Sequence, residues 1–163
     1  MEATNGVGAV RHVGIVVSDM ERSVRFYRDV LGLTPTTTLE ESGNYVDTLL
    51  SLQHADVLTV KLAAPRGEAV VELLQFKSHP DRGSGLRPIY AIGPSHIAFD
   101  VADVDRLYRR LSQAGVRCNA APVRSPNGEC KVVCCQDPDG VTIELVEVMA
   151  APRRTALREA SGP

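Results

Sequence analysis

The sequence contains no tryptophan, and aromatic residues make up only 4% of its 163 positions. It also has no run of lysine or arginine on any one predicted face, and its formal net charge is −2 with a pI near 6.1. A protein that binds nucleic acid or an anionic membrane needs a concentrated positive surface. The sequence predicts no such surface, so the expected partner is a small molecule.

Long apolar runs are also lacking. No stretch approaches the roughly 20 apolar residues that a membrane-spanning helix needs, and residues 1–9 lack the basic and apolar regions of a secretion signal. We therefore expect a cytoplasmic protein. The 44% hydrophobic and 23% charged content is typical of a globular fold, with one core or two half-sized units that share one.

Cysteine is scarce, and all four cysteines lie in the last third of the chain: Cys118, Cys130, Cys134 and Cys135. The adjacent pair should point to opposite faces of one strand, which suits neither a disulfide framework nor a zinc site of two spaced cysteine pairs. We expect reduced core or edge thiols without a chemical role.

The chain does contain a degenerate internal repeat. Residues 11–17 have the composition of a strand, and residues 18–31 have apolar positions at helical spacing, with Ser18 and Glu21 spaced as in a capping box. The pattern returns further along the chain, where His96 takes the place of His12. Polar positions repeat as well, because Asp19 matches Asp103 and Arg22 matches Arg106.

Each half of the repeat is one helix with three or four strands. Strand candidates are residues 45–52, 57–63 and 69–76 in the first half, and 131–136 and 141–148 in the second. We expect a first module at 8–77, a Pro- and Gly-rich connector at 78–94, a second module at 95–149 and a mobile tail at 150–163. Neither half can bury its sheet alone, so we expect the two to pair through their strands into one curved sheet, with the helices on its convex side.

Two carboxylates stand in the middle of apolar strands, Glu72 in the first half and Glu144 in the second. A strand whose side chains are apolar on both faces of the sheet is covered on both faces. A carboxylate buried in such a strand needs a proton, a cation or a metal to offset the cost of burying its charge. His12 and His96 open equivalent strands, and small residues two positions later leave a hollow beside them. Two imidazoles and two carboxylates suit one divalent first-row ion.

Taken singly, each of these residues also has an ordinary interpretation. A lone buried histidine can be a satisfied core residue, and a lone strand glutamate can be solvated or paired with a cation. The metal interpretation depends on the matched placement of one histidine and one glutamate in each repeat. His54 and His79 lack such a match, and we expect them to be surface residues.

These features resemble the vicinal oxygen chelate superfamily, which includes glyoxalase I, methylmalonyl-CoA epimerase, extradiol dioxygenases, fosfomycin-modifying enzymes and bleomycin-binding proteins. The resemblance covers residues 10–148. It rests on HVGIVV at 12–17, SVRFY at 23–27, LGL at 31–33, VELL at 71–74, SHIAF at 95–99 and DPDGVTIEL at 137–145. No segment maps onto the family's glutathione or coenzyme A recognition residues.

The resemblance implies an α+β fold in which two βαβββ modules form an open curved barrel. It implies one metal ligand each from His12, Glu72, His96 and Glu144, and a homodimer. The cofactor would be one divalent ion per chain, namely zinc, nickel, cobalt, manganese or iron(II). The substrate would be a small molecule with vicinal oxygens.

Four protein ligands leave two positions on an octahedral ion, enough for a chelated enediolate. We therefore expect a lyase, isomerase or epimerase of the glyoxalase I or methylmalonyl-CoA epimerase kind, in which Glu144 or Glu72 moves a proton next to a carbonyl. One alternative is an extradiol-type dioxygenase, which uses two histidines and one carboxylate on iron(II). A metal-assisted transferase and a metal-free binding protein that confers resistance are further alternatives.

Overall fold

The chain folds into two similar halves, described by a computed structural model over residues 8–81 and 89–149. The first half contains β1 (His12–Val16), α1 (Met20–Arg25), a π-helical turn η1 (Phe26–Val30), β2 (Thr34–Ser42), α2 (Asn44–Leu50), β3 (Asp56–Ala63) and β4 (Val70–Phe76). The second contains β5 (His96–Asp100), α3 (Val104–Gln113), β6 (Val123–Arg124), β7 (Cys130–Gln136) and β8 (Thr142–Val148). The predicted α+β class with two βαβββ modules is confirmed.

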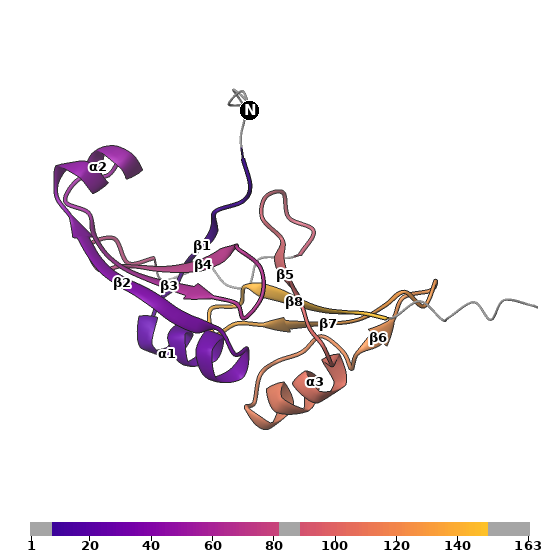
Figure 1. Cartoon of the computed structure of the whole chain (residues 1–163). Helices are drawn as coiled ribbons and strands as arrows, with labels where there is room; N and C mark the ends of the chain where they lie inside the picture. The colour runs from indigo at the N-terminus through magenta and orange to yellow at the C-terminus, as the bar shows by residue number, and fades with distance from the viewer. Residues whose placement is uncertain (1–7, 82–88, 150–163) are drawn as a thin grey trace, which may run out of the picture.

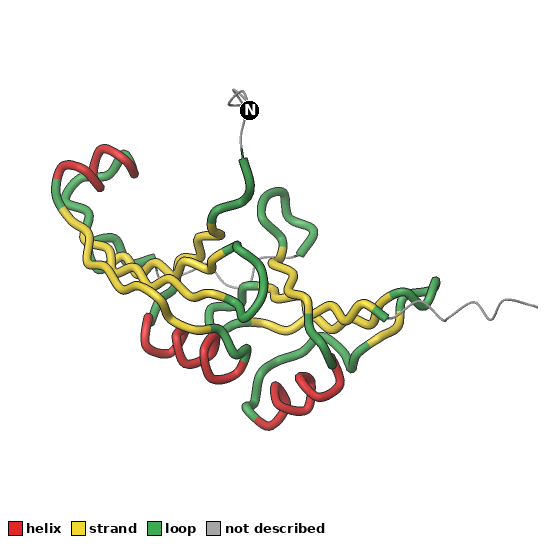
Figure 2. The backbone as a smooth tube through the Cα atoms, viewed as in Figure 1, coloured by secondary structure: helices red, strands yellow, loops and turns green. Residues whose placement is uncertain are grey.

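Each half contributes its own four-stranded sheet, with strand orders β1-β4-β3-β2 and β5-β8-β7-β6. The first strand of each half runs parallel to the last, and the remaining pairs are antiparallel. The prediction of one continuous sheet is wrong, because β1 and β5 are end strands of separate sheets. The two sheets lie side by side as an open, unclosed barrel (Figure 1; Figure 2).

The two halves share one hydrophobic core between the sheets and the helices α1 and α3, which lie on the same side of the sheets (Figure 1). Strand alternation turns Ile15, Leu73 and Ile143 toward this core, where Tyr27 and Leu111 are fully buried. Each such side chain contributes roughly 1.5–3 kcal/mol when it leaves water. The alternate residues of the same strands therefore lie on the opposite, open face.

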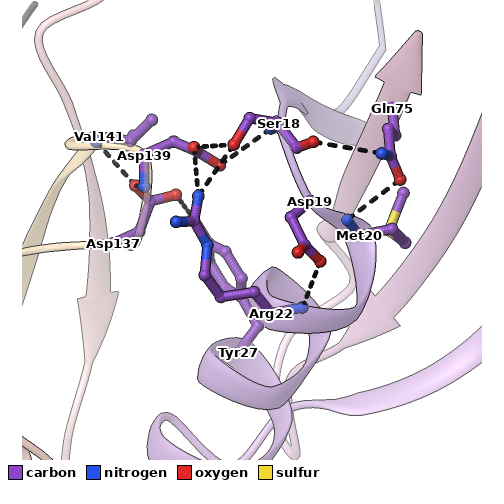
Figure 3. A network of polar contacts seen from close by, with 9 residues as sticks. All are labelled: Ser18, Asp19, Met20, Arg22, Tyr27, Gln75, Asp137, Asp139 and Val141. Atoms are coloured by element: carbon purple, nitrogen blue, oxygen red, sulfur yellow. Dashed lines mark hydrogen bonds and ion pairs between the residues drawn. The ribbon is translucent and has the colours of Figure 1, made fainter. Parts of the chain in front are cut away.

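The loop between β1 and α1 is fastened to the turn between β7 and β8 (Figure 3). The Ser18 hydroxyl and N–H donate to the Asp139 carboxylate at 2.6 and 3.1 Å, and Arg22 Nη2 donates to it at 2.6 Å. Deeper in the structure, the Tyr27 hydroxyl donates to Asp137 Oδ2 at 3.0 Å, and both residues are buried. These charge-assisted hydrogen bonds join the two halves where no strand pairing does.

The first helix begins one residue later than the capping-box spacing predicts. Asp19 is the N-cap residue, and its carboxylate accepts the Arg22 N–H at 2.9 Å. Ser18 does not cap the helix, because its hydroxyl takes part in the link between the halves. Asp103 caps α3 in the same way, accepting the Arg106 N–H at 2.8 Å. The predicted match between Asp19 and Asp103 therefore has a structural basis.

Residues 45–52, predicted as a strand, mostly form the helix α2. The helix ends at Leu50, and the residue that caps it, Ser51, has a left-handed φ of 53°. The Asp47 carboxylate then accepts the N–H groups of His54 and Ala55 at 3.1 and 2.7 Å. The prediction failed because an aspartate that binds nearby backbone groups stabilises a turn in place of a strand ladder.

The strand β2 is not predicted from the sequence. Its nine residues form one outer strand of the first sheet, and nearly all are exposed. An exposed, threonine-rich strand lacks the apolar alternation by which an inward-facing strand is recognised. Among the described residues, no helix is both long and apolar enough to cross a membrane.

Candidate metal centre

His12 and Glu72 form a pair on the open face of the first sheet. In the parallel register of β1 and β4, Gly14 lies opposite Glu72, so no side chain separates the carboxylate from the imidazole two residues earlier. His12 Nε2 is 3.2 Å from Glu72 Oε2, and the two side chains are 40% and 13% exposed. The pair presents one nitrogen and one oxygen to the open face.

His96 and Glu144 form the equivalent pair in the second sheet. Ala98 lies opposite Glu144 in the register of β5 and β8, and His96 Nε2 is 3.4 Å from Glu144 Oε2. The Ser95 hydroxyl lies 2.8 Å from His96 Nδ1, which holds the ring with Nε2 toward the carboxylate. The side chains of His96 and Glu144 are 41% and 29% exposed.

The single chain does not bring the two pairs together. Within residues 8–81 and 89–149, no three histidine, cysteine, aspartate or glutamate side chains are grouped closely enough to hold one metal ion. A groove of about 1510 Å³ lies between the β3–β4 turn and α3, and its lining includes none of the four predicted ligands. The described chain therefore carries two separate histidine–glutamate pairs, which we call half-sites.

The expectation that both glutamate strands are covered on both faces is corrected. β4 and β8 have alternating burial, with Val71, Leu73, Ile143 and Leu145 turned to the core and the glutamates on the other face. On that face the side chains of Glu72 and Glu144 are 13% and 29% exposed. The glutamates are therefore half-buried rather than fully enclosed.

Sequence reasoning missed Lys61, which lies directly opposite Glu72 on β3. Its Nζ is 3.1 Å from Glu72 Oε1, while His12 is near the other oxygen. The sequence could have revealed Lys61, because a lysine inside the apolar run of residues 57–63 is as unusual as a glutamate inside residues 69–76. In the second half, Cys134 takes the corresponding place opposite Glu144.

The chemistry of the four residues fits a divalent first-row ion. Each half-site has an imidazole nitrogen next to a carboxylate oxygen, a combination of donors that suits such ions. A two-residue half-site is too small to hold an ion tightly by itself, so a complete centre needs both pairs.

The cysteines lie outside both pairs. All four are free thiols, and burial raises the pKa of Cys135 to about 12. Burial also raises the pKa of Cys118 and, together with the charge of Glu144, that of Cys134. Thiols with raised pKa values are poor nucleophiles and poor metal ligands at neutral pH. That the cysteines have no chemical role stays a prediction.

His54 and His79 also lie outside the pairs, and both are exposed as predicted. His79 Nδ1 contacts the Ser78 hydroxyl at 2.8 Å. His54 has a left-handed φ of 55°, in the turn held by the Asp47 carboxylate.

Comparison with known proteins places the chain in a family. Residues 9–145 match the family described as the Glyoxalase/Bleomycin resistance protein/Dioxygenase superfamily. The chain belongs to this superfamily, which confirms the resemblance found in its sequence motifs.

Individual relatives resemble the chain over most of its length. It is 32% identical to the uncharacterized protein YaeR of Escherichia coli (strain K12) over 142 residues, 87% of this chain and 98% of that one. It is 30% identical to a lactoylglutathione lyase of Haemophilus influenzae over 141 residues, 85% and 91% of the two chains. The structure of a glyoxalase family protein from Bacillus cereus superposes with a TM-score of 0.82 at 22% identity, covering 92% and 100% of the chains. That likeness shows the fold.

Proposed function

We propose that this protein is a divalent-metal-dependent enzyme of the lyase, isomerase or epimerase class, which removes a proton next to a carbonyl. The observation that carries the proposal is the matched pair of half-sites, His12 with Glu72 and His96 with Glu144, at the same register in both sheets. Membership of the superfamily and the similarity to a lactoylglutathione lyase support it.

A complete centre would form between two copies of the chain. Because the pairs of one chain do not meet, a homodimer that sets the first sheet of one copy against the second sheet of its partner would assemble all four ligands. The partner's sheet would also cover the open face, which still exposes apolar side chains such as Val16 and Val148. A homodimer with two such centres has one divalent ion per chain.

The four ligands have different tasks in this proposal. When bound, a divalent ion acts as a Lewis acid that polarises a carbonyl oxygen and lowers the pKa of the neighbouring C–H group. His12 and His96 hold the ion through Nε2. Glu144, whose carboxylate has its Oε2 3.4 Å from His96 Nε2, would accept the substrate proton and return it. Glu72 is held by Lys61 and stays a ligand.

The experiment has a binding part and a chemical part. Protein reconstituted with cobalt, nickel or zinc and then desalted should retain about one ion per chain by elemental analysis, and His12→Ala and His96→Ala should not. The metal-loaded protein is then incubated in deuterated solvent with S-lactoylglutathione, or with hydroxyacetone, which lacks the glutathione group. Exchange of the proton next to the carbonyl supports the proposal. No retained ion, or no exchange with either compound, contradicts it.

One observation favours a second candidate. If the ion pair with Lys61 keeps Glu72 off the metal, then His12, His96 and Glu144 remain as two histidines and one carboxylate. That set is the iron(II) arrangement of oxygen-activating enzymes, which leaves a third position for dioxygen. Iron-dependent uptake of dioxygen with a catechol, without proton exchange, would assign the protein to this class.

A further inference from the structure

Lys61 makes the two half-sites unequal. In the first sheet Gly14, Glu72 and Lys61 lie opposite one another on neighbouring strands, and the ammonium is 3.1 Å from Glu72 Oε1. In the second sheet the corresponding neighbour of Glu144 is the thiol of Cys134, which carries no positive charge. The repeat thus conserves the ligands but places a cation beside only one of them.

This cation changes the charge of the assembled centre. Two carboxylates balance the charge of a divalent ion, and imidazoles that bind a metal are neutral. Lys61 adds one positive charge. Among the described residues its only ion-pair partner is Glu72, whose negative charge is already one of the two that balance the metal ion. A centre built from both pairs and a divalent ion therefore carries one net positive charge.

We propose that Lys61 determines specificity by selecting a chelating ligand that carries one negative charge. This inference rests on the proposed metal-dependent function. The ligand class is a small carboxylate with a hydroxyl or carbonyl oxygen on the neighbouring carbon, which offers the ion one anionic and one neutral oxygen. Such a ligand neutralises the centre, whereas a neutral chelator of the same shape leaves the charge unbalanced.

Lys61 acts on the ligand through the electric field of its ammonium group, and it does not need to contact the ligand. Its side chain is 31% exposed and is held against the half-buried carboxylate of Glu72, so solvent screens its charge only in part. At an effective dielectric constant of about 20, a unit charge several ångströms away changes the affinity for an anion by roughly tenfold or more. We expect about tenfold here.

The test uses glycolate and its neutral isostere glycolamide as probes. Full-length protein is reconstituted with cobalt(II), and dissociation constants for both probes are measured from the visible spectrum of the cobalt centre. The variants are Lys61→Met, which keeps length and loses charge, and Lys61→Arg, which keeps charge. Cys134→Ser is the matched change in the other half-site. Cobalt uptake and thermal unfolding of each variant check that the fold and the site are intact.

Lys61→Met should bind glycolate about tenfold more weakly while glycolamide binding changes less than twofold. Lys61→Arg and Cys134→Ser should keep the wild-type ratio of the two affinities. An unchanged ratio in cobalt-loaded Lys61→Met overturns the inference and leaves the metal site standing. If Lys61→Met fails to fold, a lowered ratio in Lys61→Gln supports the inference and an unchanged ratio overturns it. A wild-type protein that takes up no cobalt overturns both the proposed function and the inference.

Discussion

Glu72 and Glu144 occupy equivalent register positions but have different neighbours. Glu72 has an ammonium on one oxygen and an imidazole near the other, and it is 13% exposed. Within the described residues, the one ion-pair partner of Glu144 is the imidazole of His96, at 3.4 Å, and the Glu144 side chain is 29% exposed. A carboxylate with two partners is held in place, whereas one with a single partner can turn toward a substrate. The residue environments therefore favour Glu144 as the base.

Replacing Glu144 by glutamine should affect chemistry more than metal binding. The amide keeps the size and one oxygen donor but cannot take a proton, so we expect turnover to fall by roughly 10²-fold or more while some metal is retained. His96→Ala should lose metal and turnover together. The measurements are metal content, turnover and α-proton exchange on the same samples. Near wild-type turnover in metal-loaded Glu144→Gln would exclude Glu144 as the base.

Asp137 gives the protein a pH-dependent stability. Burial raises the pKa of its carboxyl above the ordinary value of 3.8, although hydrogen bonds from Val141, Tyr27 and Asp139 act in the opposite direction. An acid whose pKa is raised by folding stabilises the native state below its unfolded pKa, and this contribution is lost as the pH rises through the folded pKa. Stability from this group therefore falls from about pH 4 upward.

The substitution Asp137→Asn should remove this pH dependence. An asparagine can still accept the N–H groups of Asp139 and Val141 and donate to the Tyr27 hydroxyl. We expect wild type to lose stability relative to the variant as the pH rises above 4. Denaturant unfolding at several pH values between 3 and 7 measures the difference. Parallel curves for the two proteins would contradict the assignment.

The final hairpin shows how one residue controls an element. Gly140 closes the turn between β7 and β8 with a φ of 87°, and its N–H donates to the Asp137 carbonyl at 3.0 Å. Side chains with a Cβ enter this backbone region only at a cost, and β-branched ones at the highest cost. The turn also carries Asp139, which links the two halves.

Gly140→Val should therefore destabilise the protein by about 1–3 kcal/mol. Gly140→Asn is the matched control, since asparagine tolerates left-handed backbone and should cost less. Denaturant unfolding of both variants measures the free energies. Equal losses in the two would show that the backbone conformation is not the cause.

At the scale of the whole molecule, the separation of the two half-sites can be tested by mixing inactive chains. If each centre combines His12 and Glu72 of one copy with His96 and Glu144 of the other, His12→Ala and His96→Ala each abolish both centres of a homodimer. In a heterodimer of the two variants, one centre contains both substitutions and the other centre contains neither. Unfolding and refolding an equal mixture should therefore restore about a quarter of wild-type metal content and turnover, because half of the dimers are mixed.

Sedimentation of wild type should show a dimer in the same experiment. Each variant refolded alone is the control and should regain nothing. A mixture that stays inactive, in a protein shown to be dimeric, would contradict a centre shared between copies.

The sequence by itself determined the repeat, the α+β class and the four candidate ligands. Helices and inward-facing strands leave periodic apolar patterns within a dozen residues, so α1, α3, β3, β4, β7 and β8 could be predicted from local information. The histidines and glutamates stood out because a polar residue inside an apolar strand conflicts with its surroundings. Their matched positions in the two halves followed from the same comparison.

Only the tertiary structure decided how these parts meet. The separation into two sheets, the placement of Ser18 against Asp139 and the contact between Lys61 and Glu72 depend on strand registers and on residues far apart in the chain. Local patterns do not encode such pairings, since many registers satisfy the same alternation. The exposed strand β2 and the helix α2 were missed for a related reason. Their conformations are stabilised by pairing with β3 and by the Asp47 turn, and weak local propensities do not outweigh such contacts.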